Sequence, residues 1–335
     1  MSNVPENAAA EPKKRGMSQK TQKTIVILVF MAVPLALLLL FTYIPFGKMI
    51  QFSFYNMKYI GKRTFVGLAN YKQVFKNKEL FGSLVVSLYY MGGGVVQLAL
   101  SLLFATMFVF KVKGEALWKA CMFFPYLICG IAIGFIFKFF YFHGYVLDTI
   151  LMTLGMELED LPLWLQNTSI NNISLAATSV WRYTGQQTIL FLGAMMSVDT
   201  SLYEAAVLDG CNRWQQFRYI ILPSIKSIIV LNIILCVSGC LSAFEPPYVI
   251  TNGSFGTATY FVKMNSVAHE TQKVGLASAM AIILLVIIIA FTVGQQLFFK
   301  YVFNNGTDSE SREAVRRKKK EEKAAKRLAG KGMRV

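Results

Sequence analysis

The chain alternates long apolar runs with short polar segments. Six runs are long enough to cross a hydrocarbon core of about 30 Å, given a rise of about 1.5 Å per helical residue. They cover residues 25–46, 81–110, 116–141, 173–197, 224–248 and 274–302. Because a backbone in lipid has to satisfy its own hydrogen bonds, each run predicts a helix. The pattern therefore predicts an all-α membrane protein with six transmembrane helices.

The polar segments between these runs suggest how the chain is organised. We predict a first transmembrane helix at 25–46, an extracellular loop at 47–80, and a transmembrane domain at 81–302 that holds the other five helices. Basic tails at 1–24 and 303–335 flank them. The first run lacks a small-x-small cleavage site, so we interpret it as a retained helix rather than a signal peptide.

Composition and charge support this organisation. With 55% hydrophobic and 16% charged residues, the chain is too apolar for an ordinary soluble domain. The net charge of +16 raises the alternative of nucleic-acid binding, but much of the excess lies at the ends. Residues 1–24 hold five Lys/Arg against two acids, and residues 304–335 hold eleven against five. We interpret both tails as cytoplasmic and membrane-orienting rather than as a nucleic-acid site, and RRKKKEEKAAKR (316–327) as a segment suited to lie on anionic lipid headgroups.

Orientation follows from the same residues. With the N-terminus inside, the inside segments hold Lys111, Lys113, Lys119, Arg213 and Arg218 besides both tails, whereas residues 142–172 hold no Lys or Arg. Only the loop at 47–80, with six Lys/Arg between residues 58 and 78, disagrees. The distribution of Lys and Arg over all segments predicts that the N-terminus and the C-terminus both lie inside.

Polar residues within the fourth apolar run are candidates for ligand binding, because charged groups are costly in the bilayer core. Arg182 and Gln186 share one helix face, and Tyr183 and Gln187 share another, since residues four apart align. Hydrogen-bonding groups beside aromatic rings suit a polyhydroxylated ligand. Hydrogen bonding between helices is the alternative.

The fifth apolar run ends in FEPPYVITNGS (244–254). Glu245 precedes two prolines, which lack backbone donors, so we predict a helix break near the outer end of this run. The break is either the entrance for a ligand or a polar helix cap. Elsewhere the chain has no catalytic motif, no P-loop for ATP, and only His143 and His269 as histidines, so we expect no catalytic and no metal site.

The segment 199–223, which contains EAAVLDGCNRWQQFRYIILP, is polar although it lies between apolar runs. Ser201 and Glu204 form the pattern of a capping box, Gly210 predicts a helix stop, and Asn212 with Gln215 predicts a second start. Pro223 then leads into the next apolar run.

The predicted unit is helix, glycine turn, helix. Trp214, Phe217 and Ile221 share one apolar face, from which Arg213, Gln216 and Tyr219 point away. The small side chains of Ala205 and Ala206 permit close approach of another backbone. Such a unit suits docking into a groove of a cytosolic protein, and a capped re-entry loop without a partner is the alternative.

The same segment resembles the EAA loop of binding-protein-dependent ABC importers. Eight positions match its pattern, and Cys211 replaces the usual alanine: Glu204, Ala205, Ala206, Asp209, Gly210, Phe217, Leu222 and Pro223. Supporting similarities are FVGLANY (65–71), FFPY (123–126) and WLQN (164–167), whereas TNGSF (251–255) departs from the usual TGGGP. The chain therefore resembles the carbohydrate-uptake permeases of the maltose and glycerol-3-phosphate type.

This resemblance implies a type I ABC importer permease fold in a bacterial or archaeal plasma membrane. The permease binds no cofactor itself. Its expected partners are a second homologous permease, two cytosolic ATPase subunits that carry ATP and Mg²⁺, and an external solute-binding protein that delivers a sugar. ATP binding would move the coupling loop (residues 199–223) and turn the pathway outward, and hydrolysis would reset it.

The resemblance also implies residue roles. The coupling contacts would be made by Glu204, Ala205, Ala206, Asp209, Gly210, Arg213 and Phe217. The sugar would lie mid-membrane against Arg182, Tyr183, Gln186, Gln187, Cys236, Cys240, Phe244 and Glu245. Several of these differ from the maltose pattern, and Arg182 favours the further alternative of an acidic oligosaccharide. A secondary transporter driven by an ion gradient and a membrane scaffold are the rival functions.

Overall fold

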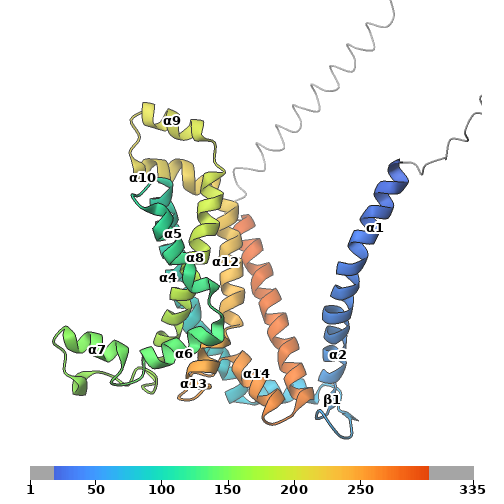
Figure 1. The fold of residues 1–335 in the computed structure, drawn as a ribbon. Coiled ribbons are helices and arrows are strands. Elements are labelled where there is room, and N and C mark those ends of the chain that lie inside the picture. Colours follow the sequence, from blue (N-terminus) through green and yellow to red (C-terminus); the bar gives the residue numbers. More distant parts are fainter. Residues whose placement is uncertain (1–18, 302–335) are drawn as a thin grey trace, which may run out of the picture. The chain divides into compact units, whose positions relative to one another are not determined.

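The structure, a computed structural model, describes residues 19–301 (Figure 1). Most of both predicted basic tails therefore lies outside the described residues. The described chain is mostly helical. Its elements are α1 (Gln19–Leu38), η1 (Leu39–Tyr43), α2 (Ile44–Ser53), β1 (Tyr55–Asn56), β2 (Thr64–Phe65), α3 (Ala69–Lys76), α4 (Lys78–Val109), α5 (Glu115–Leu127), α6 (Gly130–Phe140), α7 (Val146–Thr153), η2 (Leu158–Asp160), α8 (Asn171–Met196), α9 (Thr200–Leu208), α10 (Arg213–Gln216), η3 (Phe217–Ile221), α11 (Leu222–Ser224), α12 (Lys226–Leu241), α13 (Glu245–Thr251), α14 (Tyr260–His269) and a C-terminal helix (Val274–Tyr301).

The chain divides into two units, residues 1–52 and 53–335, which we describe separately. In the first unit, α1, η1 and α2 follow one another as one apolar helix that is longer than the predicted 25–46. The span Gln22–Ser53 has 32 residues, enough to cross a bilayer. Pro34 lies inside α1, and η1 is a π-helical turn.

Residues 47–80, predicted as a loop, contain regular structure. The end of α2 is followed by an antiparallel pairing of β1 with β2, in which Tyr55 faces Phe65, and then by α3. The side-chain amide of Asn70 on α3 donates hydrogen bonds to the carbonyls of Ser53 (2.8 Å) and Tyr55 (3.0 Å). Asn77 caps α4 by accepting from the backbone of Glu79 (3.0 Å). These local polar contacts explain why a polar segment folds here.

Helices α4 and α8 form the most extensive helix pair of the described elements. The buried face of α4 carries small and polar residues such as Ser87, Gly94, Gln97 and Ser101, whereas large apolar residues such as Leu103 are exposed. Ser101 donates a hydrogen bond to the carbonyl of Thr184 on α8 (2.9 Å). Small and polar residues at helix contacts, with apolar residues outside, are typical of proteins packed in lipid.

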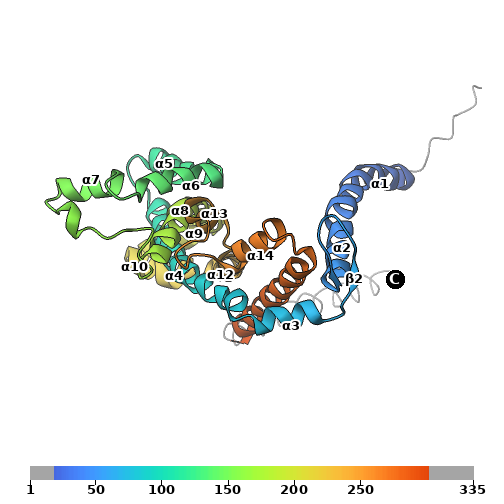
Figure 2. The same cartoon turned by 90° about the horizontal axis from the view of Figure 1, so that it is seen from below.

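Two of the predicted apolar runs are broken rather than continuous. The run 116–141 forms α5 and α6, which meet at an angle of 99°. Pro125 removes a backbone donor in the last turn of α5, and Ile128 adopts an extended conformation. Figure 2 shows α7 extending to one side of the other helices, whereas α6 lies beside α5. The prediction of a single helix over 116–141 is therefore wrong.

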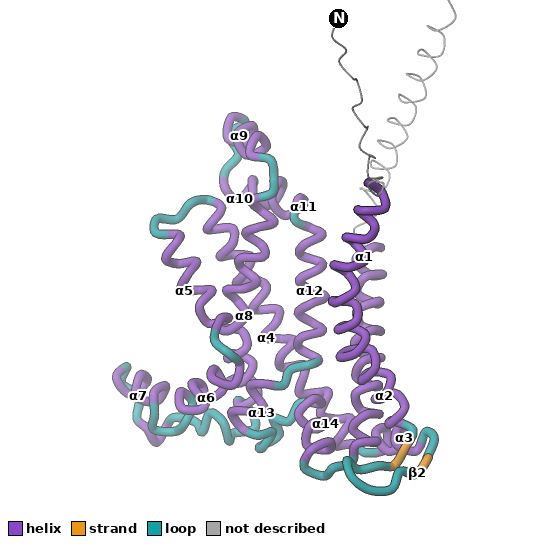
Figure 3. The backbone as a smooth tube through the Cα atoms, turned by 45° about the vertical axis from the view of Figure 1, so that its right-hand side comes forward, coloured by secondary structure: helices purple, strands orange, loops and turns teal. Residues whose placement is uncertain are grey.

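The predicted break in the fifth run is confirmed. Helix α12 ends at Leu241, and α13 begins at Glu245 with Pro246 and Pro247 in its first turn, where missing backbone donors cost nothing. Figure 3 shows α9 and α10 at one end of the long helices of this unit, and α6, α13 and α14 at the other.

Four described helices are long and apolar enough to span a membrane, or five if α5 and α6 count as one span. Helix α8 has 26 residues but is not among them, because its many polar residues lower its hydropathy. The count of six spans, the orientation and the proposed domain limits therefore remain predictions.

Candidate functional site

A polar cavity of about 890 Å³ lies among α4, α5, α8, α12 and α13. Its volume is within the range of about 300–1,000 Å³ that is usual for ligand sites. All eight residues that were predicted to contact a ligand line this polar cavity: Arg182, Tyr183, Gln186, Gln187, Cys236, Cys240, Phe244 and Glu245. The structure thus brings together residues from two segments that are about 50 positions apart in the sequence.

An ion pair crosses the polar cavity. The Nη1 atom of Arg182 on α8 donates a hydrogen bond to Oε2 of Glu245 at the start of α13. The same Nη1 reaches the hydroxyl of Tyr183 (3.2 Å), and the guanidinium lies 5.0 Å from the centre of the Tyr183 ring. The arginine side chain is 13% exposed and the glutamate side chain 39% exposed. Each charge therefore has a partner in a region where a lone charge would be costly.

Other polar atoms of the polar cavity have no partner within the described chain. They are the hydroxyl of Tyr90, Nε of Arg182 and Oε1 of Gln187. Buried polar groups are usually hydrogen-bonded, because an unmet donor or acceptor costs about 1–3 kcal/mol. The rings of Tyr126 and Tyr183 lie beside them, with centroids 6.1 Å apart. Open hydrogen-bonding capacity next to aromatic faces fits a ligand with hydroxyls and C–H faces.

Cys236 and Cys240 line the polar cavity but also hold helices together. They are one turn apart on α12, with sulfur atoms 4.0 Å apart, and the thiol of Cys240 donates to the carbonyl of Tyr90 on α4 (3.2 Å). A Cβ atom at Gly94 would lie 3.1 Å from the Cys240 sulfur. The two cysteines thus fill the contact between α4 and α12.

Sequence reasoning missed the contributions of other helices to the polar cavity, including Tyr90, Gln97 and Tyr126. Gln97 carried a signal, since it is the only side-chain amide within the apolar run 81–110. Tyr126 belongs to the FFPY stretch next to the α5–α6 break. Tyr90 carried no such signal in the sequence, because aromatic residues are common in apolar helices. No group of three or more metal-binding side chains occurs within residues 19–301.

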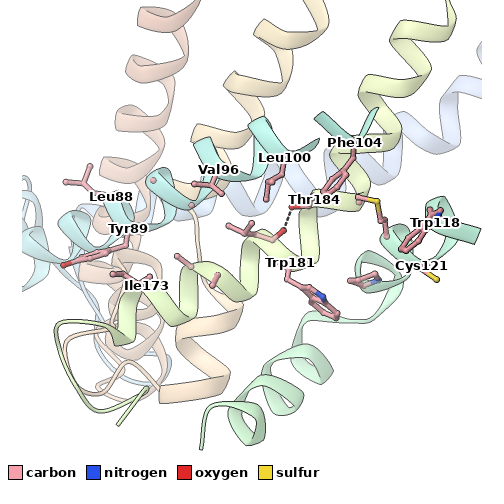
Figure 4. Close-up of a pocket in the computed structure, with 18 of the residues that line it drawn as sticks. Leu88, Tyr89, Val96, Leu100, Phe104, Trp118, Cys121, Ile173, Trp181 and Thr184 are labelled. Atoms are coloured by element: carbon pink, nitrogen blue, oxygen red, sulfur yellow. Dashed lines mark hydrogen bonds between the residues drawn. The ribbon is translucent and has the colours of Figure 1, made fainter. Parts of the chain in front are cut away.

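A second, apolar hollow of about 1120 Å³ lies among α4, α5 and α8 (Figure 4). Phe104, Trp118 and Trp181 are among its lining residues, and none of the lining residues is charged. Few of the lining side chains can hydrogen-bond, so most hydroxyl groups placed there would lose bonds to water without replacement, which is unfavourable. The apolar hollow is therefore unsuited to a polyhydroxylated ligand.

The coupling loop (residues 199–223) forms the predicted helix, glycine turn and helix. Gly210 has φ of +77°, and the amides of Gly210 and Cys211 bond to the carbonyls of Val207 (3.1 Å) and Ala206 (2.8 Å). This pair of bonds defines a Schellman motif at the end of α9. The reciprocal bonds of Asn212 and Gln215 (2.8 and 2.9 Å) form a capping box, which confirms the predicted second helix start at α10.

The start of α9 differs from the prediction. Asp199, not Ser201, is the N-cap, and its carboxylate accepts a hydrogen bond from the backbone of Ser201 (3.0 Å). This bond, together with one from the Ser201 hydroxyl, holds the pKa of Asp199 below its ordinary value. A charged carboxylate at a helix start also interacts well with the helix dipole, so it outcompetes the serine.

The predicted coupling residues fall into two groups. Glu204, Ala205, Asp209, Gly210 and Arg213 are exposed, whereas Ala206 is buried and Phe217 is half-buried. Only Ala205 of the two alanines therefore exposes its side chain. The guanidinium of Arg213 lies 5.5 Å from the ring centre of Phe110, next to the end of α4.

The apolar face predicted for α10 also needs correction. Trp214 is 68% exposed, whereas Gln216 is buried and donates to the carbonyl of Cys211 (3.1 Å). Phe217 and Ile221 do pack inward, against Phe191 and Met195 of α8 among others. The α-helix changes to a π-helix at Phe217, which rotates the following side chains relative to an ideal helix.

The fold combines long apolar helices with a polar cavity between them. Residues 97–303 match the family of binding-protein-dependent transport system inner membrane components, and the chain belongs to this family. It is a multi-pass membrane protein and the permease subunit of an ABC importer, as the resemblance predicted. Family membership decides against the secondary transporter.

Individual relatives support the assignment to ABC transporter permeases. The chain is 30% identical to a probable ABC transporter permease protein, YesP of Bacillus subtilis (strain 168), over 75% of this chain and 82% of that protein. It is 27% identical to the trehalose/maltose transport system permease protein MalF of Thermococcus litoralis, over 71% of this chain and 81% of that protein. A bacterial ABC transporter involved in the import of the acidic polysaccharide alginate shares the fold, with a TM-score of 0.73 at 20% identity over 85% of this chain and 98% of that one.

Proposed function

We propose that this chain forms the translocation pathway for a sugar or oligosaccharide and that the polar cavity is its binding site. The observation that carries the proposal is the set of unpartnered polar atoms beside tyrosine rings: Tyr90, Arg182 and Gln187. Sugar hydroxyls both donate and accept hydrogen bonds, and the C–H faces of a sugar ring pack on aromatic rings. The trehalose/maltose system of Thermococcus litoralis, a relative, supports this substrate class.

The energy for transport comes from partner subunits in this proposal. The coupling loop exposes Val207, Leu208, Trp214 and Tyr219, each more than 60% accessible. Apolar side chains on an otherwise polar surface favour a protein interface. We assign this interface to a cytosolic ATPase subunit that binds ATP and Mg²⁺, so that this chain is itself non-catalytic. A second permease and an external solute-binding protein complete the importer in a bacterial or archaeal plasma membrane.

Uptake into proteoliposomes tests the proposal directly. The assembled transporter, with ATP enclosed and the binding protein outside, is offered a panel of labelled mono- to tetrasaccharides. We expect uptake of at least one sugar that stops when ATP is omitted. Failure of every sugar in the panel, with ATPase activity intact, would remove the sugar assignment.

Gln186→Ala and Gln187→Ala test the polar cavity as the site. Each removes one amide that would bond to a hydroxyl, and a hydrogen bond contributes about 0.5–1.5 kcal/mol. We therefore expect the apparent KM for the transported sugar to rise about three- to tenfold in each variant. Gln73→Ala, at an exposed position of α3, is the matched control and should leave KM unchanged. Equal KM values in all three variants would contradict the placement of the sugar.

A further inference from the structure

The polar cavity has no net charge. Of the residues that line it, only Arg182 and Glu245 are charged, and they are bonded to each other. The other polar side chains that line it are amides, hydroxyls and thiols. A ligand that enters therefore meets hydrogen-bonding groups without an uncompensated charge.

The backbone before Glu245 is held from two sides. The hydroxyl of Thr259 donates to the carbonyl of Ala243 (2.6 Å). The ring of Phe244 stacks on Tyr248, with centroids 4.7 Å apart, and also contacts Phe261. Because the two residues before it, Ala243 and Phe244, are anchored, Glu245 directs its carboxylate into the polar cavity.

The space for the carboxylate is provided by Gly130, the first residue of α6. A Cβ atom at this position would overlap the carboxylate of Glu245. The two helix breaks, between α5 and α6 and between α12 and α13, therefore meet at this carboxylate.

We infer that the polar cavity selects an uncharged sugar and that Glu245 is the specificity-determining residue that rejects acidic sugars. An acidic sugar that bonded to Arg182, at Nε or in place of Glu245, would bring a second carboxylate to a guanidinium that already pairs with Glu245. Two like charges a few ångströms apart repel strongly at the low effective dielectric of such a site. A neutral sugar requires no such exchange, since Nε of Arg182 and the amides remain available to its hydroxyls.

This inference rests on the proposed function and narrows its substrate class. It replaces the expectation that Arg182 favours an acidic oligosaccharide, because that expectation did not include the pairing with Glu245. The inferred substrate also differs from that of the importer of the acidic polysaccharide alginate, which shares the fold. The two are compatible, because similarity at 20% identity extends to the fold alone.

Equilibrium binding to the assembled transporter tests the inference. Two pairs of probes are used: maltotriose with its analogue oxidised at one primary hydroxyl to a carboxylate, and galactotriose with trigalacturonate. Isothermal titration in lipid nanodiscs without the binding protein gives Kd for each probe. The quantity compared is the charge-selectivity ratio, which is Kd of the acidic probe divided by Kd of its neutral counterpart.

The wild-type protein should bind the neutral member more tightly in at least one pair. Glu245→Gln leaves Arg182 uncompensated, so the charge-selectivity ratio should fall about tenfold or more. The double variant Arg182→Gln/Glu245→Gln has no net charge in the polar cavity and should regain most of the ratio. Gly130→Ala retains both charges but displaces the carboxylate, so it should lower the ratio without removing an ionisable group.

Glu79→Gln is the matched control. Glu79 pairs with Lys263 (2.5 Å) but does not line the polar cavity, so its removal should leave the ratio unchanged. If the wild type prefers the acidic probes, or if neither Glu245→Gln nor Gly130→Ala lowers the ratio, the inference fails while the sugar assignment stands. If no probe of either charge binds and the uptake panel is also negative, the proposed function fails with it.

Discussion

Gly210→Pro is expected to abolish ATP-driven uptake although the protein still reaches the membrane. This is the largest effect that we predict. Proline holds φ near −65°, whereas Gly210 has φ of +77°. The Schellman bonds at the end of α9 then cannot form, and α9 and α10 lose their mutual orientation. A misfit of about 3 kcal/mol reduces the population of the native turn by about 100-fold. Uptake in proteoliposomes and membrane level by immunoblot are the two measurements.

Two further variants of the coupling loop test the shape of its backbone and its surface contact separately. Gly210→Asn is the matched control, because asparagine tolerates a left-handed conformation, and it should keep most of the uptake. Glu204→Ala leaves α9 intact, since alanine is the best helix former, but removes an exposed carboxylate from the proposed ATPase interface. We expect it to abolish uptake and weaken copurification of the ATPase. Normal uptake by both Gly210→Pro and Glu204→Ala would overturn the role assigned to the coupling loop.

Gly185→Ala is expected to destabilise the protein strongly, although it adds only one methyl group. Gly185 lies where α8 crosses α5, and a Cβ atom there would overlap the backbone carbonyl of Met122. Backbone atoms cannot rotate away, so the two helices have to separate. Overpacking of this kind costs about 3 kcal/mol. We expect a clearly lower Tm of the purified transporter and weaker sugar binding, since Gln186 and Gln187 follow directly.

Gly193→Ala is the control for this substitution. It lies on the same helix, and a Cβ atom there would meet nothing within 4 Å. Alanine is also a better helix former than glycine by about 1 kcal/mol, so Tm should stay or rise slightly. Equal Tm values for Gly185→Ala and Gly193→Ala would show that the contact of α5 with α8 is looser than the structure indicates.

Short-range features were predictable from the sequence. The glycine turn at Gly210 and the capping box of Asn212 with Gln215 depend on bonds between residues at most five positions apart, so the local sequence contains all partners. The cap of α9 was misassigned because Asp199 and Ser201 both suit an N-cap, and local spacing does not rank them. The face of α10 was mispredicted because a π-helical turn follows it, which sequence periodicity does not reveal.

The polar cavity was predictable only in part. On α8, helical spacing is enough to align Arg182 with Gln186 and Tyr183 with Gln187. Tyr90 and Tyr126 come from other helices, and their inclusion depends on how α4 and α5 pack against α8. That packing depends on which small residue permits a close approach, and Gly185 does so here although many glycines occur in the chain.

The sequence by itself determined that this is a helical membrane protein with a helix–glycine–helix coupling loop and a polar stripe on one long helix. These properties follow from hydropathy and from hydrogen bonds between close neighbours. The tertiary structure decided that Arg182 is neutralised by Glu245, a residue 63 positions away, at the point where two broken helices meet. Such a pairing depends on the three-dimensional packing of α6, α8 and α13, so no periodicity or local motif contains it. The charge of the polar cavity, and with it the kind of sugar that we infer, is therefore a property of the fold.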